Sequence, residues 1–344
     1  MRASLRGLFV AVIGVALGLT ALAGPASATL NPFKTFPDAA LSIDGGAFNN
    51  GDTTSVPSGI INPLQSNTPA GATILAAYLY VADVFGGGVA GDVTLNGTVL
   101  PVASGTLLAP NENPANTRRF DVTANVTAQI GAGGLVTHTY SESGFTDGAV
   151  LVVAWKNAST AGGTAVILDG ELARAGDTTN VSFGAYTGGD FLMSLADSYS
   201  FGDSQFTTVD VTTSSTAMRR LTNCAGGNDD GNFVNANGTL ITAGGIGDSP
   251  SNPGPTCRGA AADDELYNLA LGDTADLSPF IKTGDTSLRF DTINPSNDDN
   301  IFAMFISSQF GVIVGPTVPE PASLVLLGAG LAGLGIYFRR GRRR

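Results

Sequence analysis

DGAVLVVAWKN, residues 147–157, is an almost unbroken apolar run with turn-forming residues at both ends. It is rich in valine and has no alternation between polar and apolar positions. A run of this kind is typical of a strand that is buried on both of its faces. It therefore predicts a fully buried central strand.

Short β-rich runs recur along the chain between turn signals. In the run 91–102, Asn96-Gly97 separates two short apolar segments, which is the strongest short-range indication of a hairpin. The other runs are residues 72–84, 118–130, 135–143, 164–172, 179–186, 191–201, 206–213, 286–293 and 299–314. Together with 46 glycines and the lack of long helical periodicity, they predict an all-β fold, a β-sandwich or jelly roll.

A weak internal repeat suggests a division of the chain. A pattern of turn, glycine-containing turn, strand and buried strand begins at Asp121 and occurs again from Asp276. Two similar β-sandwich lobes, residues 29–168 and 169–314, would explain this repeat, and chance similarity among Gly- and Asp-rich β sequences is the alternative. The second lobe would carry a long loop at 222–265, which is dominated by Gly, Asn, Asp and Pro.

The chain begins with the features of a secretory signal peptide. Arg2 and Arg6 are followed by an apolar run from about Leu8 to Ala23 and then by the small residues Ala26-Ser27-Ala28. We expect signal peptidase to cleave after Ala28, so residues 1–28 are excluded from the fold.

The C-terminal segment, residues 315–344, has three parts. Pro319-Glu320-Pro321 comes first, and Ala322–Phe338 follows with only Ser323 polar. As a helix this stretch would be about 25 Å long, enough for a thin hydrocarbon core, which predicts a single transmembrane helix. The charges behind it are Arg339, Arg340, Arg342, Arg343 and Arg344. Such a cluster resists translocation and stays on the cytoplasmic side of the membrane. The body of the chain would therefore lie on the opposite, outer side, tethered by its tail.

The order and spacing of these three parts closely resemble the PEP-CTERM sorting signal of Gram-negative bacteria. The resemblance covers only about the last 27 residues. It implies recognition by an exosortase-type membrane protease, removal of the tail, and delivery to the cell surface or extracellular matrix. Within the body, the stretches 222–265 and 294–302 resemble parts of uncharacterised PEP-CTERM ectodomains, and this likeness implies no biochemical activity.

The body between signal peptide and tail is strongly acidic. It holds 10 of the 17 Lys and Arg residues and 28 of the 29 Asp and Glu residues, a balance of about 18 negative charges. Such a charge repels phosphate backbones, so we expect no binding to nucleic acid.

Cys224 and Cys257 are the two cysteines of the chain. In an oxidising compartment an even pair most simply forms a disulfide bond. Closing this loop would stabilise the fold by about 3–4 kcal/mol in the chain-entropy model.

The residues for catalysis are sparse. His138 is the only histidine, and its place between Val136 and Tyr140 predicts a structural role in a strand. Ser204 and Ser249 each follow Gly-Asp, as in GDSL-type hydrolases, but the late Asp-x-x-His of that family has no match here. We therefore expect that the protein is not an enzyme.

Adjacent acidic residues occur in turn-like stretches. Asp229, Asp230, Asp298 and Asp299 lie among asparagines and glycines. Turn formation through their side chains is the simplest interpretation. Calcium binding is the alternative, since Ca²⁺ prefers clustered oxygen ligands, although the spacing does not match an EF-hand loop.

These observations predict an exported protein of the cell surface, extracellular matrix or biofilm, with a structural or adhesive role and no cofactor other than calcium. A carbohydrate-binding sandwich that contacts extracellular polysaccharide is the second hypothesis. A secreted hydrolase is the third.

Overall fold

In the computed structural model the run 147–156 lies in β11 (Thr146–Lys156), which is flanked by a strand on each side. β11 pairs antiparallel with β2 (Ala40–Ala47) and with β4 (Thr73–Asp83). Val150 and Val152 face one hydrophobic core, and alternate residues such as Leu151 face another. The prediction of a fully buried central strand is confirmed for this apolar part, and the two cores explain why the run shows no polar face.

The structure describes residues 30–47, 64–83, 91–108, 117–143, 146–172, 176–198, 206–226, 241–252, 254–255, 265–294 and 300–315. These belong to one compact unit, Ala28–Thr317. The signal peptide and the tail lie outside the described residues.

Three large antiparallel sheets make up most of the described chain. The first sheet has the order β2-β11-β4-β8-β7, with β8 at Thr117–Asp121 and β7 at Thr106–Leu107. The central sheet has the order β1-β12-β20-β14-β17, with β18 also paired to β14; the bounds are β1 Asn31–Pro37, β12 Thr164–Asp169, β20 Asn300–Ser308, β14 Phe191–Ser198, β17 Ile241–Ala243 and β18 Leu266–Asn268. The third sheet has the order β16-β15-β19-β13-β21; the bounds are β16 Arg219–Ala225, β15 Thr207–Thr213, β19 Ser287–Ile293, β13 Asp177–Phe183 and β21 Val312–Val314.

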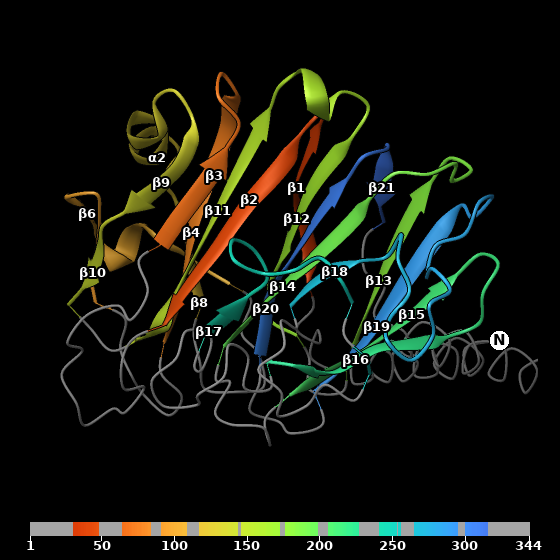
Figure 1. Ribbon diagram of the computed structural model, residues 1–344. Helices are drawn as coiled ribbons and strands as arrows, with labels where there is room; N and C mark the ends of the chain where they lie inside the picture. Colours follow the sequence, from red (N-terminus) through yellow and green to blue (C-terminus); the bar gives the residue numbers. More distant parts are fainter. Residues whose placement is uncertain are drawn as a thin grey trace, which may run out of the picture. The chain divides into compact units, whose positions relative to one another are not determined.

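The central sheet is covered on both faces. On β12, Val166 and Leu168 pack toward the third sheet, whereas Ile167 packs toward the first sheet. The period-2 alternation of strand side chains sends neighbouring residues into opposite cores. All six residues of β12 are buried. The stacking of the sheets on either side of β12 and β20 can be followed in Figure 1.

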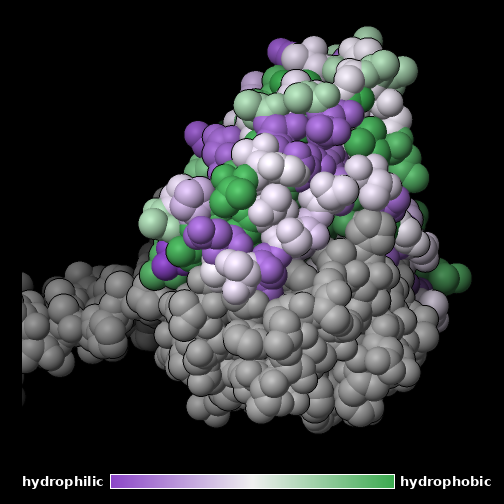
Figure 2. Space-filling model, turned by 90° about the vertical axis from the view of Figure 1, so that its left-hand side faces the viewer, coloured by the Kyte–Doolittle hydropathy of each residue, from purple (hydrophilic) through white to green (hydrophobic). Residues whose placement is uncertain are grey.

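A further layer covers the outer face of the first sheet. It consists of one helix and two small groups of strands, which share a core with Leu79 and Leu151. These elements are α2 (Thr123–Ile130), the pair β3 (Leu64–Thr68) and β9 (Gly134–His138), and the sheet β10 (Tyr140–Glu142), β5 (Val93–Leu95) and β6 (Thr98–Leu100). Figure 2 views the molecule from this side, where hydrophilic and hydrophobic residues are interspersed.

The hairpin predicted at Asn96-Gly97 is confirmed. β5 and β6 pair directly across these two residues. Both have positive φ, 50° for Asn96 and 76° for Gly97, as the tight hairpin turn with the favoured twist requires. The turn therefore determines the register of β5 against β6.

The run 118–130 is only partly a strand, contrary to the expectation of a β-rich run. Its first residues form β8, but residues 123–130 form α2. Val126 and Ile130 are four residues apart and both are buried, so one helical face packs against the first sheet. Asp121 fixes the turn before the helix, because its Oδ1 accepts hydrogen bonds from the amide and the hydroxyl of Thr123, at 3.0 and 2.7 Å, while Val122 is the N-cap residue.

The all-β, sandwich-type prediction is confirmed by these packed antiparallel sheets. The proposed boundary between lobes, after residue 168, falls within β12, which pairs with β1 and with β20. The division into two lobes stays a prediction. Within the predicted loop 222–265, a strand does form at β17.

The central packing can be tested with one matched pair of substitutions. Ile167 is fully buried between the first and central sheets, whereas the side chain of Ile313 is 71% exposed. We expect Ile167→Ala to lower the free energy of unfolding by about 2–5 kcal/mol, because it leaves a cavity, and Ile313→Ala to change it by less than about 0.5 kcal/mol. Urea unfolding measures both; equal effects would contradict the assignment of Ile167 to a core.

Candidate functional site

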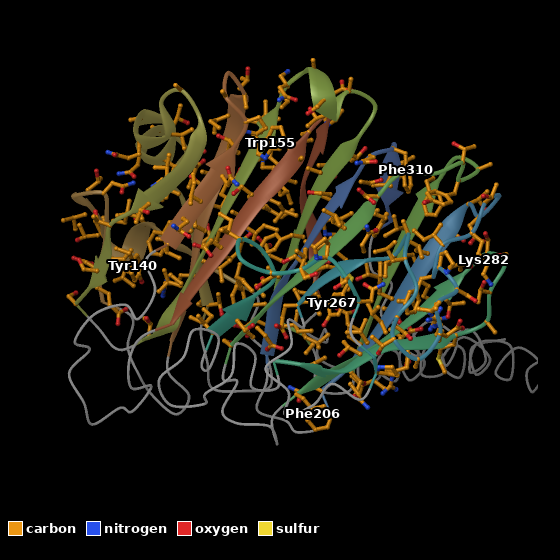
Figure 3. The ribbon with its side chains drawn as sticks, in the orientation of Figure 1. Tyr140, Trp155, Phe206, Tyr267, Lys282 and Phe310 are labelled. Atoms are coloured by element: carbon orange, nitrogen blue, oxygen red, sulfur yellow. The ribbon has the colours of Figure 1, made fainter. Side chains whose placement is uncertain are left out.

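A cleft of about 290 Å³ lies where the first and central sheets meet residues 244–247. Its walls come from β2, β3, β14, β18 and β20. The described lining residues are Leu41, Ser42, Ile43, Asn67, Leu192, Ser194, Gly244, Gly245, Ile246, Gly247, Leu266, Phe305 and Ser307. Leu266 of β18 lines the cleft, and the next residue, Tyr267, is fully buried in the core shared with the third sheet (Figure 3).

Hydrogen bonds hold the walls of the cleft together. Ser194 Oγ donates to the Gly244 carbonyl at 2.5 Å, and the Ile246 amide donates to the Ile43 carbonyl at 2.9 Å. The Ser42 hydroxyl accepts from the Asn67 amide at 2.8 Å. The segment after β17 is therefore tied to both sheets.

Glycine is required where this segment passes closest to its neighbours. A Cβ atom on Gly244 would overlap the backbone of Glu265, and one on Gly245 would overlap the backbone of Ile43. The buried carboxylate of Glu265 supports the same region, since it accepts from the Gly226 amide at 2.7 Å and from the Thr242 hydroxyl at 2.9 Å.

The chemistry available in the cleft is hydrogen bonding and apolar contact. The described lining contributes hydroxyl groups, one amide side chain, backbone groups, aliphatic side chains and the aromatic ring of Phe305, and none of these side chains titrates near neutral pH. General acid–base catalysis needs such a titrating group within hydrogen-bond reach of the substrate. The lining as described can bind a ligand but does not supply a proton-transfer group.

His138 is buried and lies in β9, a strand position as its alternation with Val136 and Tyr140 predicted, and it is not one of the described residues that line the cleft. Its Nε2 is 2.9 Å from Ser66 Oγ, and its Nδ1 is 3.0 Å from Asn96 Nδ2. Asn96 Oδ1 accepts from the Thr139 amide at 3.1 Å, so the NH₂ group of Asn96 faces the imidazole. Nδ1 is therefore an acceptor, and the ring proton lies on Nε2.

This tautomer is the reverse of the one that a catalytic Ser-His-Asp site uses. There, Nε2 takes the proton of the serine and Nδ1–H is held by a carboxylate. Here Nε2–H donates to Ser66, which is itself fully buried. Burial also lowers the pKa of His138, which keeps the ring neutral. The Ser66–His138–Asn96 group therefore has the geometry of a structural network.

A buried ion pair joins the first sheet to the central sheet. Arg119 of β8 pairs with Asp169 of β12, and the Tyr80 hydroxyl donates to Asp169 at 2.8 Å. The Arg119 guanidinium also lies 3.3 Å from the centre of the Phe33 ring on β1. Burial raises the pKa of Asp169, while the hydrogen bonds from Arg119 and Tyr80 oppose that rise. Sequence reasoning missed this pair, because nothing in the local pattern links residues 50 positions apart.

Most of the sequence-predicted site residues lie outside the described residues. These are Pro319, Glu320, Pro321, Arg339, Arg340, Arg342, Arg343, Arg344, Cys257, Asp229, Asp230, Asp298, Asp299 and Ser204. The backbone of Cys224 is described and lies in β16. The disulfide and the calcium site therefore stay predictions.

Ser249, the other serine that follows Gly-Asp, has an ordinary structural place, and so do Asp285 and Trp155. Ser249 is exposed and its Oγ lies 2.7 Å from that of Ser251. Asp285, in the Gly-Asp-Thr at 284–286, accepts from the Lys282 amide at 2.8 Å, as a turn-forming aspartate does. Trp155 is half-buried at the end of β11 (Figure 3).

Among the described residues there is neither a metal-binding cluster nor a membrane-spanning helix. No three or more His, Cys, Asp and Glu side chains gather there in a way that could hold a metal ion. In the same part of the chain, no helix is both long and apolar enough to span a bilayer.

Comparison with known proteins identifies one segment. Residues 317–344 match the family model of the PEP-CTERM protein-sorting motif. No curated protein matches the chain. Among solved structures, the major capsid protein P2 from bacteriophage PM2 is 12% identical, covering 82% of this chain and 99% of its own, with a TM-score of 0.18, too low to support any argument.

The neutral state of His138 can be measured directly, because the chain has one histidine. We expect its NMR titration midpoint in the folded protein to lie below the ordinary value near 6.5. Because the folded state then binds fewer protons than the unfolded state, the contribution of His138 to stability is full above pH 6.5 and falls below it. The urea-unfolded chain is the control; a folded midpoint at or above that of the unfolded chain would refute the proposed network.

The buried ion pair can be compared with an exposed one. We expect Arg119→Met to lower the free energy of unfolding by about 3–5 kcal/mol, because it leaves the buried Asp169 without its charge partner. Arg289 pairs with Asp291 at 2.8 Å, but its side chain is 54% exposed, so Arg289→Met should cost at most about 1 kcal/mol. Denaturant unfolding of both variants at pH 7 makes the comparison, and similar losses would argue against a structural role for the pair.

Proposed function

We propose that this protein has a structural or adhesive role at the cell surface or in the extracellular matrix. It carries a PEP-CTERM sorting motif and is therefore an exported protein that an exosortase sorts. The matched motif at residues 317–344 is the observation that carries this proposal. In it, signal peptidase removes residues 1–28, the tail holds the chain in the inner membrane for a time, and the exosortase releases the body to the exterior.

The packing and the charge of the body support a structural or adhesive role, which requires a stable fold and a hydrated surface. Its sheets are packed through three continuous cores. The body carries an excess of about 18 negative charges, which favours a hydrated surface and solubility of the protein. The cleft lining and the tautomer of His138 favour a binding or structural role over a hydrolytic one.

A carbohydrate-binding module is the second candidate, and the cleft is the observation that favours it. Ser42, Asn67, Ser194 and Ser307 bring hydroxyl and amide groups to its walls, beside aliphatic side chains. Polar groups of this kind, placed among apolar ones, are what a small-molecule site uses to orient a ligand. An extracellular polysaccharide would supply the matching hydroxyl groups.

Processing of the tail is the first test. In a host that has an exosortase, we expect the mature protein to lack residues from about Pro319 onward and to be recovered outside the inner membrane. Replacing Pro319-Glu320-Pro321 by three alanines should leave the arginine cluster attached and the protein in the membrane fraction. Pro316→Ala, just outside the matched segment, is the control. Intact-mass measurement shows whether the tail is still attached in the wild type, in the triple-alanine variant and in Pro316→Ala. Full-length wild-type protein that persists in the membrane would refute the proposal.

Polysaccharide binding separates the two candidate roles. If the cleft binds glycans, Asn67→Ala should weaken retention on a glycan array while leaving the fold intact, because Asn67 is exposed and brings its amide side chain to the cleft wall. Asn180→Ala, which changes an exposed asparagine of β13 on the third sheet, is the matched control. No retention of the wild-type protein on any glycan would leave the structural or adhesive role as the better account.

A further inference from the structure

The carboxylate of Asp177 accepts a hydrogen bond from the backbone amide of Leu30, the first residue that the structure describes. The Leu30 amide donates to Asp177 Oδ2 at 2.7 Å, across 147 positions of sequence. Leu30 is 1% exposed and belongs to the core between the central and third sheets. The contact therefore joins the first described residue to the start of β13.

Asp177 itself is held firmly in place. Its Oδ1 accepts from the Thr178 amide at 2.8 Å, and its carbonyl accepts from the hydroxyl of Thr292, which lies opposite it on β19. The preceding Gly176 has φ of 103°, and a Cβ atom there would overlap the Thr292 carbonyl. The backbone around the carboxylate is thus locked against the neighbouring strand.

Cleavage after Ala28 would create a positive charge next to this carboxylate. The new α-amino group would belong to Thr29, one residue before Leu30. Bond lengths and angles limit the distance between consecutive backbone nitrogens to about 3.7 Å, whatever the conformation of the residue. Since the Leu30 nitrogen is 2.7 Å from Asp177 Oδ2, the ammonium nitrogen would lie within roughly 6.4 Å of that oxygen.

We propose that Asp177 is the binding site for the ammonium group of the mature N-terminus, so that removal of the signal peptide completes an ion pair and stabilises the folded body. Before cleavage the Thr29 nitrogen is an uncharged amide. After cleavage it is a cation, and an opposite charge within about 4–6 Å favours the charged form of a carboxylate. This inference rests on the signal-peptide cleavage that the proposed function includes.

The electrostatics of Asp177 in the uncleaved chain agree with this. Burial raises its pKa to about 6, against the two amide hydrogen bonds, which lower it. No charged side chain of the described residues contributes to that shift. Two charged groups on adjoining strands have their own partners: Asp291 pairs with Arg289 on β19, and Asp169 of β12 pairs with Arg119.

The test compares one protein with its amine free and blocked. Mature protein is purified after export, its first residue is established by mass, and half is acetylated selectively at the α-amine. We expect acetylation to lower the melting temperature at pH 7 by about 2–4 °C in the wild type and by less than about 1 °C in Asp177→Asn. Asp291→Asn, which removes a neighbouring acid on β19, is the matched control and should respond like the wild type.

The pH dependence gives a second readout. In the acetylated chain the folded pKa of Asp177 lies above its ordinary value of 3.8, so its contribution to stability is full below about pH 4 and is lost as pH rises through about 6. The free ammonium restores that contribution. The difference in melting temperature should therefore appear between about pH 4 and 7, and shrink above about pH 8 as the amine loses its proton.

A third measurement needs no stable variant at Asp177. The pKa of the α-amine, followed by NMR, should exceed its ordinary value of about 7.7–8.0 in the wild type. If mass shows a first residue other than Thr29, the cleavage premise fails and the proposal with it. If Thr29 is first but acetylation leaves the wild-type melting curve unchanged, or shifts Asp177→Asn equally, the ion pair is refuted while export stands.

Discussion

Burial of both faces of the central sheet is the constraint on which the rest of the structure depends. A strand in this position has no solvent side, and the middle of each of the two inner strands is accordingly an unbroken apolar run, residues 165–168 in β12 and 301–306 in β20. Covering two faces requires two further sheets, and the first sheet, itself apolar on both faces, requires another layer of its own. The layered arrangement in Figure 1 follows from this requirement.

Polar groups that enter such an interior must be paired there. Asp169 lies at the end of β12 and is matched by Arg119 and Tyr80 from the first sheet, so its charge also connects the two sheets. His138 is held neutral between Ser66 and Asn96. An unpaired buried charge would cost several kcal/mol, and these contacts therefore constrain how the layers are positioned relative to one another.

Sorting information and stable structure are located in different parts of the chain. The tail carries a short sorting motif that an exosortase, a membrane protease, recognises, and the packed sheets lie in the body. In the proposal built on the contact of Leu30 with Asp177, removal of the predicted signal peptide would stabilise the body. Processing at the C-terminal end would release the protein, and processing at the N-terminal end would stabilise it.

Local signals in the sequence determined the features that depend on neighbouring residues. The buried strand around residues 149–154 follows from continuous apolar character, and the Asn96-Gly97 turn from the positive φ that such a hairpin demands. The helix at Thr123–Ile130 was missed, because Val126 and Ile130 count as a helical face only once the first sheet lies beneath them. Likewise the cleft, the Arg119–Asp169 pair and the Leu30–Asp177 contact exist only in the folded chain. Each joins segments 50 or more positions apart, and only the stacking of the sheets brings their backbones together.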